Sequence, residues 1–165
     1  MGSEILVAAP ADATELAEVA AATFPLACPS RVAAEDIARF IDAQLSALRF
    51  TEYLADPDKR VLAVRDGGRI IGYALLIHPA GEPAAELSKF YLLSEHHGTG
   101  AAKQLMRAAL DWACETGALS IWLGVNRNNE RAQAFYRKLG FAVTGTRTFE
   151  VGGATEHDLL MTRPL

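Results

Sequence analysis

A strand, a glycine-bearing turn and a long amphipathic helix follow one another between Ala85 and Trp112. The turn, residues 94–100, contains Gly98 and Gly100, and the helix after it has one apolar face. This order brings unpaired backbone N–H groups and the positive end of a helix dipole to one place. Because glycine has no Cβ, an anion can approach the main chain closely there. The segment therefore predicts a phosphate-binding turn.

Two better-known phosphate-binding motifs do not describe this turn. The chain contains no G-x-x-x-x-G-K-[ST] run, which a P-loop requires. A Rossmann turn requires a third glycine where this chain has Lys103, and it belongs to an opening βαβ unit, whereas this turn lies far from the N-terminus. An ordinary tight turn between a strand and a helix stays open as the alternative.

Two blocks of the sequence resemble those of a known family. Residues 97–102, HGTGAA, resemble the [Q/R]-x-x-G-x-[G/A] signature of the GCN5-related N-acetyltransferases (GNAT), which bind acetyl-coenzyme A. Residues 125–141 resemble the family's N-x-x-A-x-x-x-Y…G-F segment, at the usual distance downstream. The resemblance covers about residues 5–162, so we expect a single N-acetyltransferase domain over residues 1–165. One departure is His97, which stands where the family usually has Gln or Arg.

The resemblance also implies where the coenzyme binds. In the family, main-chain amides of the turn hold the pyrophosphate, the pantetheine arm lies between the fourth and fifth strands, and an amide near Leu92 polarises the thioester carbonyl. Asn129 matches the position that contacts the coenzyme from the following helix, and Tyr136 matches the tyrosine near the sulfur. The cofactor-binding residues implied in this way are Phe90, Tyr91, Leu92, His97, Gly98, Thr99, Gly100, Ala101, Ala102, Lys103, Asn129 and Tyr136.

Two residues are predicted to carry the proton transfers, Tyr136 as general acid and Glu86 as general base. The departing thiolate has a conjugate thiol with a pKa of about 8.5, so a phenol with a pKa near ~10 can donate a proton to it. An acceptor amine with a pKa of about 10.4 must lose a proton, which Glu86 can take with a water held by Ser88. The alternatives are a core aromatic role for Tyr136 and a solvated strand-end acid for Glu86.

The composition of the 165-residue chain is that of an ordinary globular enzyme, with 50% hydrophobic and 22% charged residues and a net charge of −4. Its Lys and Arg residues form no basic run, which disfavours nucleic-acid or membrane-surface binding. No Lys or Arg precedes Arg31, so a secretory n-region is not expected, and the apolar run Ile70–Ile77 is too short to span a bilayer. Cys28 and Cys114 offer neither zinc-ligand spacing nor a disulfide framework, so we expect a cytoplasmic protein without a metal.

Hydrophobic periodicity outlines the first third of the chain. It predicts a short strand at residues 5–8, a helix from Asp12 to about Thr23, a turn with two prolines at residues 24–29, and a second helix whose apolar stripe runs from Ile37 to Leu54 across a kink.

Turn residues and caps outline the rest. Residues 66–69 predict a hairpin, Asn128 or Asn129 caps the helix that contains Tyr136, and a closing hairpin turns at residues 152–153. The helix between the fourth and fifth strands is a crossover, so these strands run parallel. We therefore expect an α/β (α+β) fold with a mixed central sheet of about seven strands and about four helices. The family's acyl-CoA N-acyltransferase fold has this order, and the resemblance implies that the fourth and fifth strands splay apart.

The function that these expectations support best is acetyl transfer from acetyl-CoA, as co-substrate, to a primary amine of a small molecule, by direct attack in a ternary complex. Residues 87–93 and 148–153 look like the branch of the family that includes bacterial polyamine N-acetyltransferases, so a polyamine or an amino acid is the expected acceptor. A protein or peptide N-terminal acetyltransferase and a catalytically silent acyl-CoA sensor stay open. A closed tunnel near the second helix would favour the small acceptor over a peptide. A homodimer is also expected, because many relatives dimerise.

Overall fold

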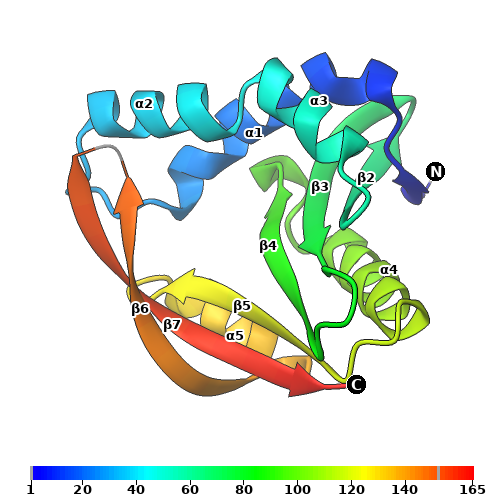
Figure 1. The fold of residues 1–165 in the computed structure, drawn as a ribbon. Coiled ribbons are helices and arrows are strands. Elements are labelled where there is room, and N and C mark those ends of the chain that lie inside the picture. Colours follow the sequence, from blue (N-terminus) through cyan, green and yellow to red (C-terminus); the bar gives the residue numbers. More distant parts are fainter. Residues whose placement is uncertain (1, 152) are drawn as a thin grey trace.

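A single mixed sheet of seven strands forms the centre of the computed structural model, which describes residues 2–151 and 153–165 (Figure 1). The strand order is β1-β2-β3-β4-β5-β7-β6, with β4 and β5 parallel and the other neighbours antiparallel, as the sequence predicts. Gly152, in the predicted closing turn, lies outside the described residues. The strands are β1 (Glu4–Val7), β2 (Lys59–Asp66), β3 (Arg69–Ile77), β4 (Ala84–Leu92), β5 (Ser120–Asn126), β6 (Ala142–Val151) and β7 (Ala154–Pro164).

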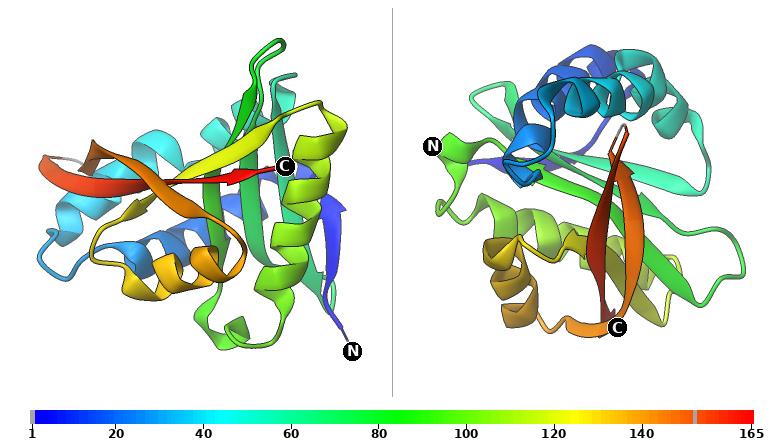
Figure 2. Two further views of the ribbon diagram at one scale, coloured as in Figure 1. Left: turned by 90° about the horizontal axis from the view of Figure 1, so that it is seen from below. Right: turned by 90° about the vertical axis from the view of Figure 1, so that its left-hand side faces the viewer.

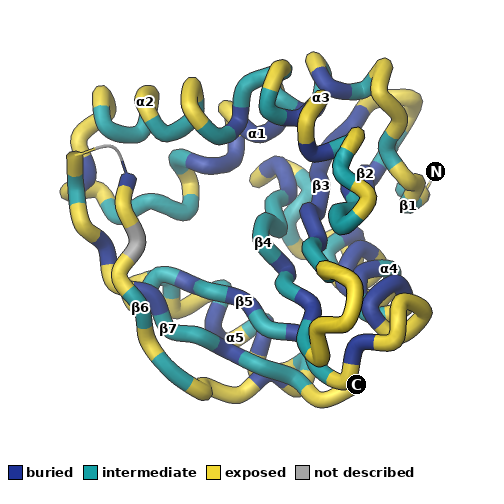
Figure 3. The backbone as a smooth tube through the Cα atoms, in the orientation of Figure 1, coloured by how far each residue is buried: buried dark blue, intermediate teal, exposed yellow. Residues whose placement is uncertain are grey.

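Helices cover both faces of this sheet (Figure 2). In the described part of the chain they are α1 (Ala13–Ala27), α2 (Ala34–Gln44), α3 (Ala47–Ala55), α4 (Ala101–Glu115) and α5 (Glu130–Lys138), with short 3-10 turns at η1 (Pro10–Asp12) and η2 (Ser94–His96). The first three helices lie on one face, and α4 and α5 lie on the other. Figure 3 shows that α4 turns a buried side to the sheet, whereas α2 has no buried residue and lies at the rim.

The first helix is longer than expected, because it continues through Pro25 to Ala27 where the sequence predicts a turn. A proline this close to the end of a helix removes one backbone hydrogen bond and leaves the preceding turns intact. Packing stabilises the extension, since the ring of Phe24 is buried and stacks on Phe40 with centroids 4.5 Å apart. The end of α1 is thereby placed beside β4.

The expected second helix is divided into α2 and α3, which is why the described chain has five α-helices rather than about four. Leu45 is fully buried at the break, and Ser46 begins α3 as its N-cap. The N–H of Arg49 donates to the Ser46 hydroxyl at 3.2 Å. At the position where the apolar stripe predicts a kink, one helix therefore ends and a second, separately capped helix begins.

Replacing Ser46 with alanine is expected to lower the free energy of unfolding by about 1 kcal/mol, because α3 loses its cap. Urea denaturation measures this change. Ser30→Ala is the control, because Ser30 is an exposed turn residue, and its effect should stay within about 0.5 kcal/mol. A Ser46→Ala variant as stable as the wild type would show that burial of Leu45 alone sets the break.

Strands β4 and β5 separate soon after they begin. They pair over Ala84–Glu86 and Ser120–Trp122, and beyond these residues no pairing joins them within the described chain. From there β4 pairs with β3, and β5 pairs along its whole length with β7. The expected splay is confirmed, and it leaves one edge of β4 without a neighbouring strand.

A bulge at Ser88 decides which way the side chains of β4 point. In the pairing with β3, Leu87 lies opposite Leu76 while Lys89 lies opposite Leu75, so Ser88 is the extra residue. Without the bulge, alternation would place Glu86 and Lys89 on opposite faces. With it, three side chains of β4 share the face covered by α1 to α3, whereas Phe90 points to the other face, toward α5. The three are Glu86, Lys89 and Tyr91.

Candidate active site

The glycine turn between β4 and α4 adopts the backbone that the sequence predicts. Gly98 has φ +82° and Gly100 has φ +89°, and Gly100 is the residue immediately before α4. At either glycine a Cβ would meet no heavy atom of the described chain within 4 Å. The first N–H groups of α4 have no helical carbonyl to bond with. The turn therefore offers an anion several main-chain donors and a helix N-terminus.

The side chain of His97 connects the turn to the end of β4 by a hydrogen bond. Its Nε2 donates to the carbonyl of Leu92 at 2.8 Å, because a carbonyl can only accept. This bond links the turn to the last residue of the strand. The Nε2 atom of His97 is therefore already hydrogen-bonded to a main-chain carbonyl.

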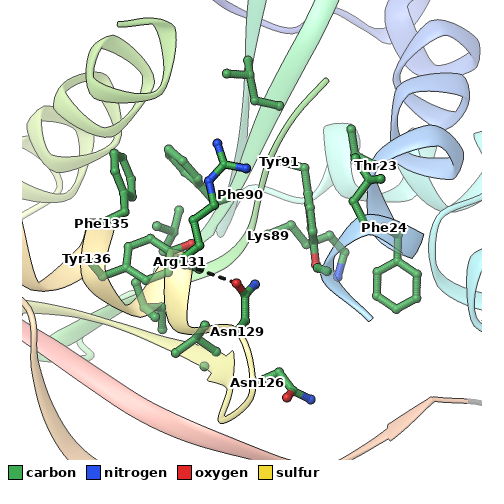
Figure 4. A pocket seen from close by; sticks show the side chains of 18 of the residues that line it. Thr23, Phe24, Lys89, Phe90, Tyr91, Asn126, Asn129, Arg131, Phe135 and Tyr136 are labelled. Atoms are coloured by element: carbon green, nitrogen blue, oxygen red, sulfur yellow. Dashed lines mark hydrogen bonds between the residues drawn. The ribbon is translucent and has the colours of Figure 1, made fainter. Parts of the chain in front are cut away.

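A cleft of about 930 Å³ opens where β4 and β5 separate (Figure 4). It is lined by the glycine turn, the facing sides of β4 and β5, the end of α1, α5 and the closing hairpin β6–β7. Of the predicted residues, Thr99 and Ala101 do not line it: the Thr99 hydroxyl bonds the carbonyl of His96, and Ala101 is buried under the turn. The predicted residues that do line it are Glu86, Phe90, Tyr91, Leu92, His97, Gly98, Gly100, Ala102, Lys103, Asn129 and Tyr136.

Tyr136 enters the cleft from α5, and its position follows from the cap of that helix. The N–H of Ala132 donates to Oδ1 of Asn129 at 3.2 Å, so Asn129, rather than Asn128, begins α5. Residues 129, 132 and 136 then lie on one side of the helix. Tyr136 is 8% exposed and packs against Phe90 at 6.3 Å and Phe141 at 5.9 Å between ring centroids. Figure 4 shows its hydroxyl directed toward the centre of the cleft.

The Tyr136 hydroxyl is a neutral donor at physiological pH. Burial raises the pKa of this phenol above its usual value, because the charged phenolate is disfavoured away from water. The phenolic proton is therefore present throughout the neutral and mildly alkaline range. A group in this state can donate a proton.

The cleft is also lined by charged residues that no sequence motif predicted. Glu156 and Asp158 from β7 are 3% and 5% exposed, and both line the cleft. Arg31 donates to Oε1 of Glu156 at 2.9 Å, and Arg147 donates through Nε to Oδ2 of Asp158 at 3.2 Å. A spacing of two residues on a strand puts both acids on one face, which is the signal that the sequence offered. The partner arginines lie in other elements, so the pairings themselves were not predictable.

Glu86 and Lys89 lie together on the face of β4 that carries α3. Burial lowers the pKa of Lys89 to about 8, although the nearby charge of Glu86 acts to raise it. Burial also raises the pKa of Glu86, while the nearby cations Arg147, Lys89 and Lys59 act to lower it. Lys89 Nζ lies 5.7 Å from the centroid of the Tyr53 ring. The predicted base is thus surrounded by cations, and Lys89 is an additional titratable group of the cleft.

Within residues 2–151 and 153–165, no three His, Cys, Asp or Glu side chains gather closely enough to hold a metal ion. No helix in the same ranges is long and apolar enough to cross a membrane.

The sequence matches the family model described as the acetyltransferase (GNAT) family over residues 20–141. The chain belongs to this family, and it is an acetyl-CoA-dependent N-acetyltransferase. The family expected from the HGTGAA turn and the residues 125–141 block is thereby confirmed.

Relatives extend this result over nearly the whole chain. An uncharacterised N-acetyltransferase of Mycobacterium tuberculosis (strain H37Rv) is 56% identical over 154 residues, covering 93% of this chain and 98% of the relative. The streptothricin acetyltransferase of Streptomyces lavendulae is 34% identical over 113 residues, covering 66% of this chain and 60% of the relative. The PaiA N-acetyltransferase of Thermoplasma acidophilum, solved in complex with coenzyme A, superposes with a TM-score of 0.86 over the full length of both chains at 24% identity. This last likeness shows the fold.

Proposed function

We propose that the protein transfers the acetyl group of acetyl-CoA to a primary amine of a small molecule by direct attack in a ternary complex. One observation carries the proposal: a single cleft is lined by the glycine turn, by Tyr136 and by the buried carboxylates of β7. A coenzyme and an amine bound together in this cleft would meet beside Tyr136. No covalent intermediate with the enzyme is needed for this reaction.

The coenzyme end of the cleft supports binding by main-chain groups. The diphosphate would lie on the amides of residues 98–103, with the cations Lys103 and Arg131 lining the same cleft. The free edge of β4 past Glu86 would pair with the amide groups of the pantetheine arm, as an added strand does. Phe90, Tyr91 and Leu92 belong to that edge. An N–H of this edge aimed at the thioester oxygen would contribute about 3 kcal/mol to stabilising the transition state.

Tyr136 would protonate the departing thiolate. Its hydroxyl faces the cleft, and its raised pKa keeps it protonated. The thiol that forms has a pKa of about 8.5, so the transfer from a neutral phenol is compatible with turnover at neutral pH. For the base, Glu86 stays the prediction from the sequence, and the β7 carboxylates add further candidates.

Two links between the β6–β7 hairpin and the α2 region favour a small amine over a polypeptide as the acceptor. The tip of the β6–β7 hairpin reaches α2, where the N–H of Gly153 donates to Asp36 Oδ1 at 3.0 Å (Figure 1). Arg31, in the segment before α2, is tied to Glu156 of the same hairpin. These two links close the side of the cleft along which a peptide would otherwise extend. The streptothricin acetyltransferase among the relatives is consistent with a small amine acceptor.

A polyamine or an amino acid stays the predicted acceptor, and a cytoplasmic homodimer stays the predicted state of the protein. The buried acids Glu156 and Asp158 support an acceptor that carries positive charge.

A thiol-release screen with acetyl-CoA tests the proposal. Simple alkylamines, diamines and polyamines, amino acids and short peptides are compared at equal concentration. We expect release of coenzyme A with one or more small amines at a rate at least tenfold above that with any peptide. Higher activity on peptide N-termini would favour the N-terminal acetyltransferase, and binding of acetyl-CoA with no acceptor would favour the sensor.

A further inference from the structure

Lys89 is a cation that lines the cleft from β4. Its ammonium group lies 5.7 Å from the centroid of the Tyr53 ring. Among residues 2–151 and 153–165, this ammonium group forms no ion pair and no hydrogen bond. An ammonium that is moved out of water without gaining an anion as partner is unfavourable, because its lost hydration is not replaced. The cleft therefore contains a positive group that an anionic ligand would stabilise.

The other two cations around the same ring already have carboxylate partners. Arg49 and Lys59 lie 5.2 and 5.6 Å from its centroid. Arg49 is paired with Glu52 at 3.2 Å. Lys59 is paired with Asp56 at 3.0 Å. Neither of these two cations lines the cleft, whereas Lys89 does, so Lys89 is the one of the three that a molecule bound in the cleft can reach.

Tyr91 supplies a second donor on the same face of β4. It lies two positions after Lys89, beyond the bulge at Ser88, so both side chains are on the face toward α1 to α3. Its ring packs against Phe24 and Tyr73, with centroids 6.3 and 5.9 Å apart. Figure 4 shows its hydroxyl and the Lys89 ammonium directed into the cleft. In the part of the chain that the structure describes, this hydroxyl has no hydrogen-bond partner.

The two donors together fit a carboxylate. Burial raises the pKa of Tyr91, so its hydroxyl keeps its proton and can only offer an anion a neutral donor. A carboxylate accepts hydrogen bonds at two oxygens, and the bond from an ammonium is strengthened by its charge. One ammonium also supplies one positive charge, which matches a carboxylate better than a phosphate dianion.

The buried acids of β7 already have cationic partners. Glu156 accepts from Arg31 at 2.9 Å, and Asp158 accepts from Arg147 at 3.2 Å. A polyamine in this cleft would therefore bring further positive charge toward an ammonium that has no anion. An amine that also carries a carboxylate would instead supply the missing partner.

We propose, on the basis of the proposed function, that the acceptor is an aminocarboxylate whose carboxylate binds to Lys89 and to the Tyr91 hydroxyl while its amine reaches the thioester. Lys89 and Tyr91 are then the residues that determine acceptor specificity, and an amino acid is selected over a polyamine. The main chain of Tyr91 stays available to the pantetheine arm, because strand side chains point out of the sheet while the edge N–H and C=O groups lie in its plane.

The charge of Lys89 makes this contact dependent on pH. Burial lowers the pKa of Lys89 to about 8. The titratable and charged groups around it are Glu86 and Tyr91 on β4, Arg49 and Tyr53 on α3, Lys59 on β2 and Arg147 on β6. Glu86 acts to raise the pKa and the three cations act to lower it. Only the charged ammonium attracts a carboxylate, so KM for an aminocarboxylate, relative to that for a plain amine, should rise as the pH passes about 8.

Thiol-release assays with saturating acetyl-CoA at neutral pH compare each aminocarboxylate with the amine that lacks its carboxyl group. The pairs are glycine and methylamine, β-alanine and ethylamine, γ-aminobutyrate and propylamine, and L-phenylalanine and phenethylamine, with spermidine as the polyamine. The pairs differ in the spacing between nitrogen and carboxylate. We expect kcat/KM of the wild type to be at least about tenfold higher for one or more aminocarboxylates than for the paired amine.

Lys89→Met removes the charge and keeps a side chain of similar length. It should raise KM for the preferred aminocarboxylate at least about tenfold, while kcat, and both constants for the paired amine, stay within about threefold. The effect falls on KM because the carboxylate is bound away from the reacting atoms. Lys89→Arg keeps the charge and should recover part of the preference. Lys138→Met, at an exposed lysine of α5 outside the cleft, is the matched control and should change neither constant.

Tyr91→Phe keeps the test valid if Lys89→Met does not fold, because the ring contacts with Phe24 and Tyr73 remain. It should raise KM for the same aminocarboxylate about three- to tenfold and leave the paired amine unaffected. Calorimetry with coenzyme A, giving an affinity within about threefold of the wild type, shows that a variant is folded.

The two members of each pair separate this inference from the proposed function. Equal losses with an aminocarboxylate and its paired amine in Lys89→Met and Tyr91→Phe would overturn the inference and leave the proposed function standing. A wild type that prefers spermidine or the plain amines to every aminocarboxylate would do the same. A wild type that binds acetyl-CoA and acetylates none of these acceptors would overturn the proposed function, and the inference with it.

Discussion

Gly100→Glu is expected to weaken coenzyme A binding by at least about 100-fold, or 2.7 kcal/mol. Gly100 lines the cleft at the N-terminus of α4, and a side chain there would project into open space rather than into the protein. The added carboxylate would occupy the position proposed for the diphosphate and repel it. Because a negative charge is favourable at a helix N-terminus, the variant should still fold.

Calorimetry with coenzyme A measures this loss, and Gly68→Glu is the matched control. Gly68 has φ +80° and open space beyond its Cβ position, but it lies in the β2–β3 turn and does not line the cleft. Both variants carry a similar cost for a side chain in the left-handed region, about 1–2 kcal/mol. Gly68→Glu should bind coenzyme A as the wild type does. Retained binding in Gly100→Glu would refute the assignment of the phosphate site.

Tyr136→Phe is expected to lower kcat by at least tenfold with little change in coenzyme affinity. The substitution keeps the ring packed between Phe90 and Phe141 and removes the hydroxyl that faces the cleft. A factor of ten corresponds to about 1.4 kcal/mol of transition-state stabilisation, within the range of general acid catalysis. Since burial raises the pKa of Tyr136, loss of the phenolic proton should not limit the wild type at pH 9.

Tyr73→Phe provides the control for removing a buried tyrosine hydroxyl. Tyr73 is fully buried, and its hydroxyl has no hydrogen-bond partner among the described residues. Its removal should leave kcat unchanged and leave stability equal or higher, because an unsatisfied buried hydroxyl costs free energy. Thiol release under saturating substrates gives kcat for both variants. Unchanged turnover in Tyr136→Phe would remove this residue from the mechanism.

Most of the predicted elements depend on local features, and these were predicted well. Glycines at positive φ mark the turn between β4 and α4, and the side-chain acceptor of Asn129 marks the start of α5. The crossover helix between β4 and β5 required parallel strands, as observed. The errors lie where packing overrides local preference: α1 continues through Pro25 because Phe24 stacks on Phe40, a residue of another helix.

The side-chain contacts beside the proposed acceptor site could not be predicted from local sequence patterns. Arg31 and Glu156 lie 125 positions apart, and Asp36 and Gly153 lie 117 apart, so no local pattern connects them. The bulge at Ser88 depends on the register between β4 and β3, which the sequence of β4 alone does not reveal. It reverses the direction of every side chain that follows it in the strand.

The sequence by itself determined the family, the order of the elements and the backbone of the glycine turn proposed to bind the coenzyme, because glycine conformations, helix caps and hydrophobic periods act over a few neighbouring residues. The tertiary structure alone decided which charged groups meet in the acceptor end. Asp158, which accepts a hydrogen bond from Arg147, is buried only once β5, β6 and β7 are assembled, and this burial raises the pKa of its carboxyl.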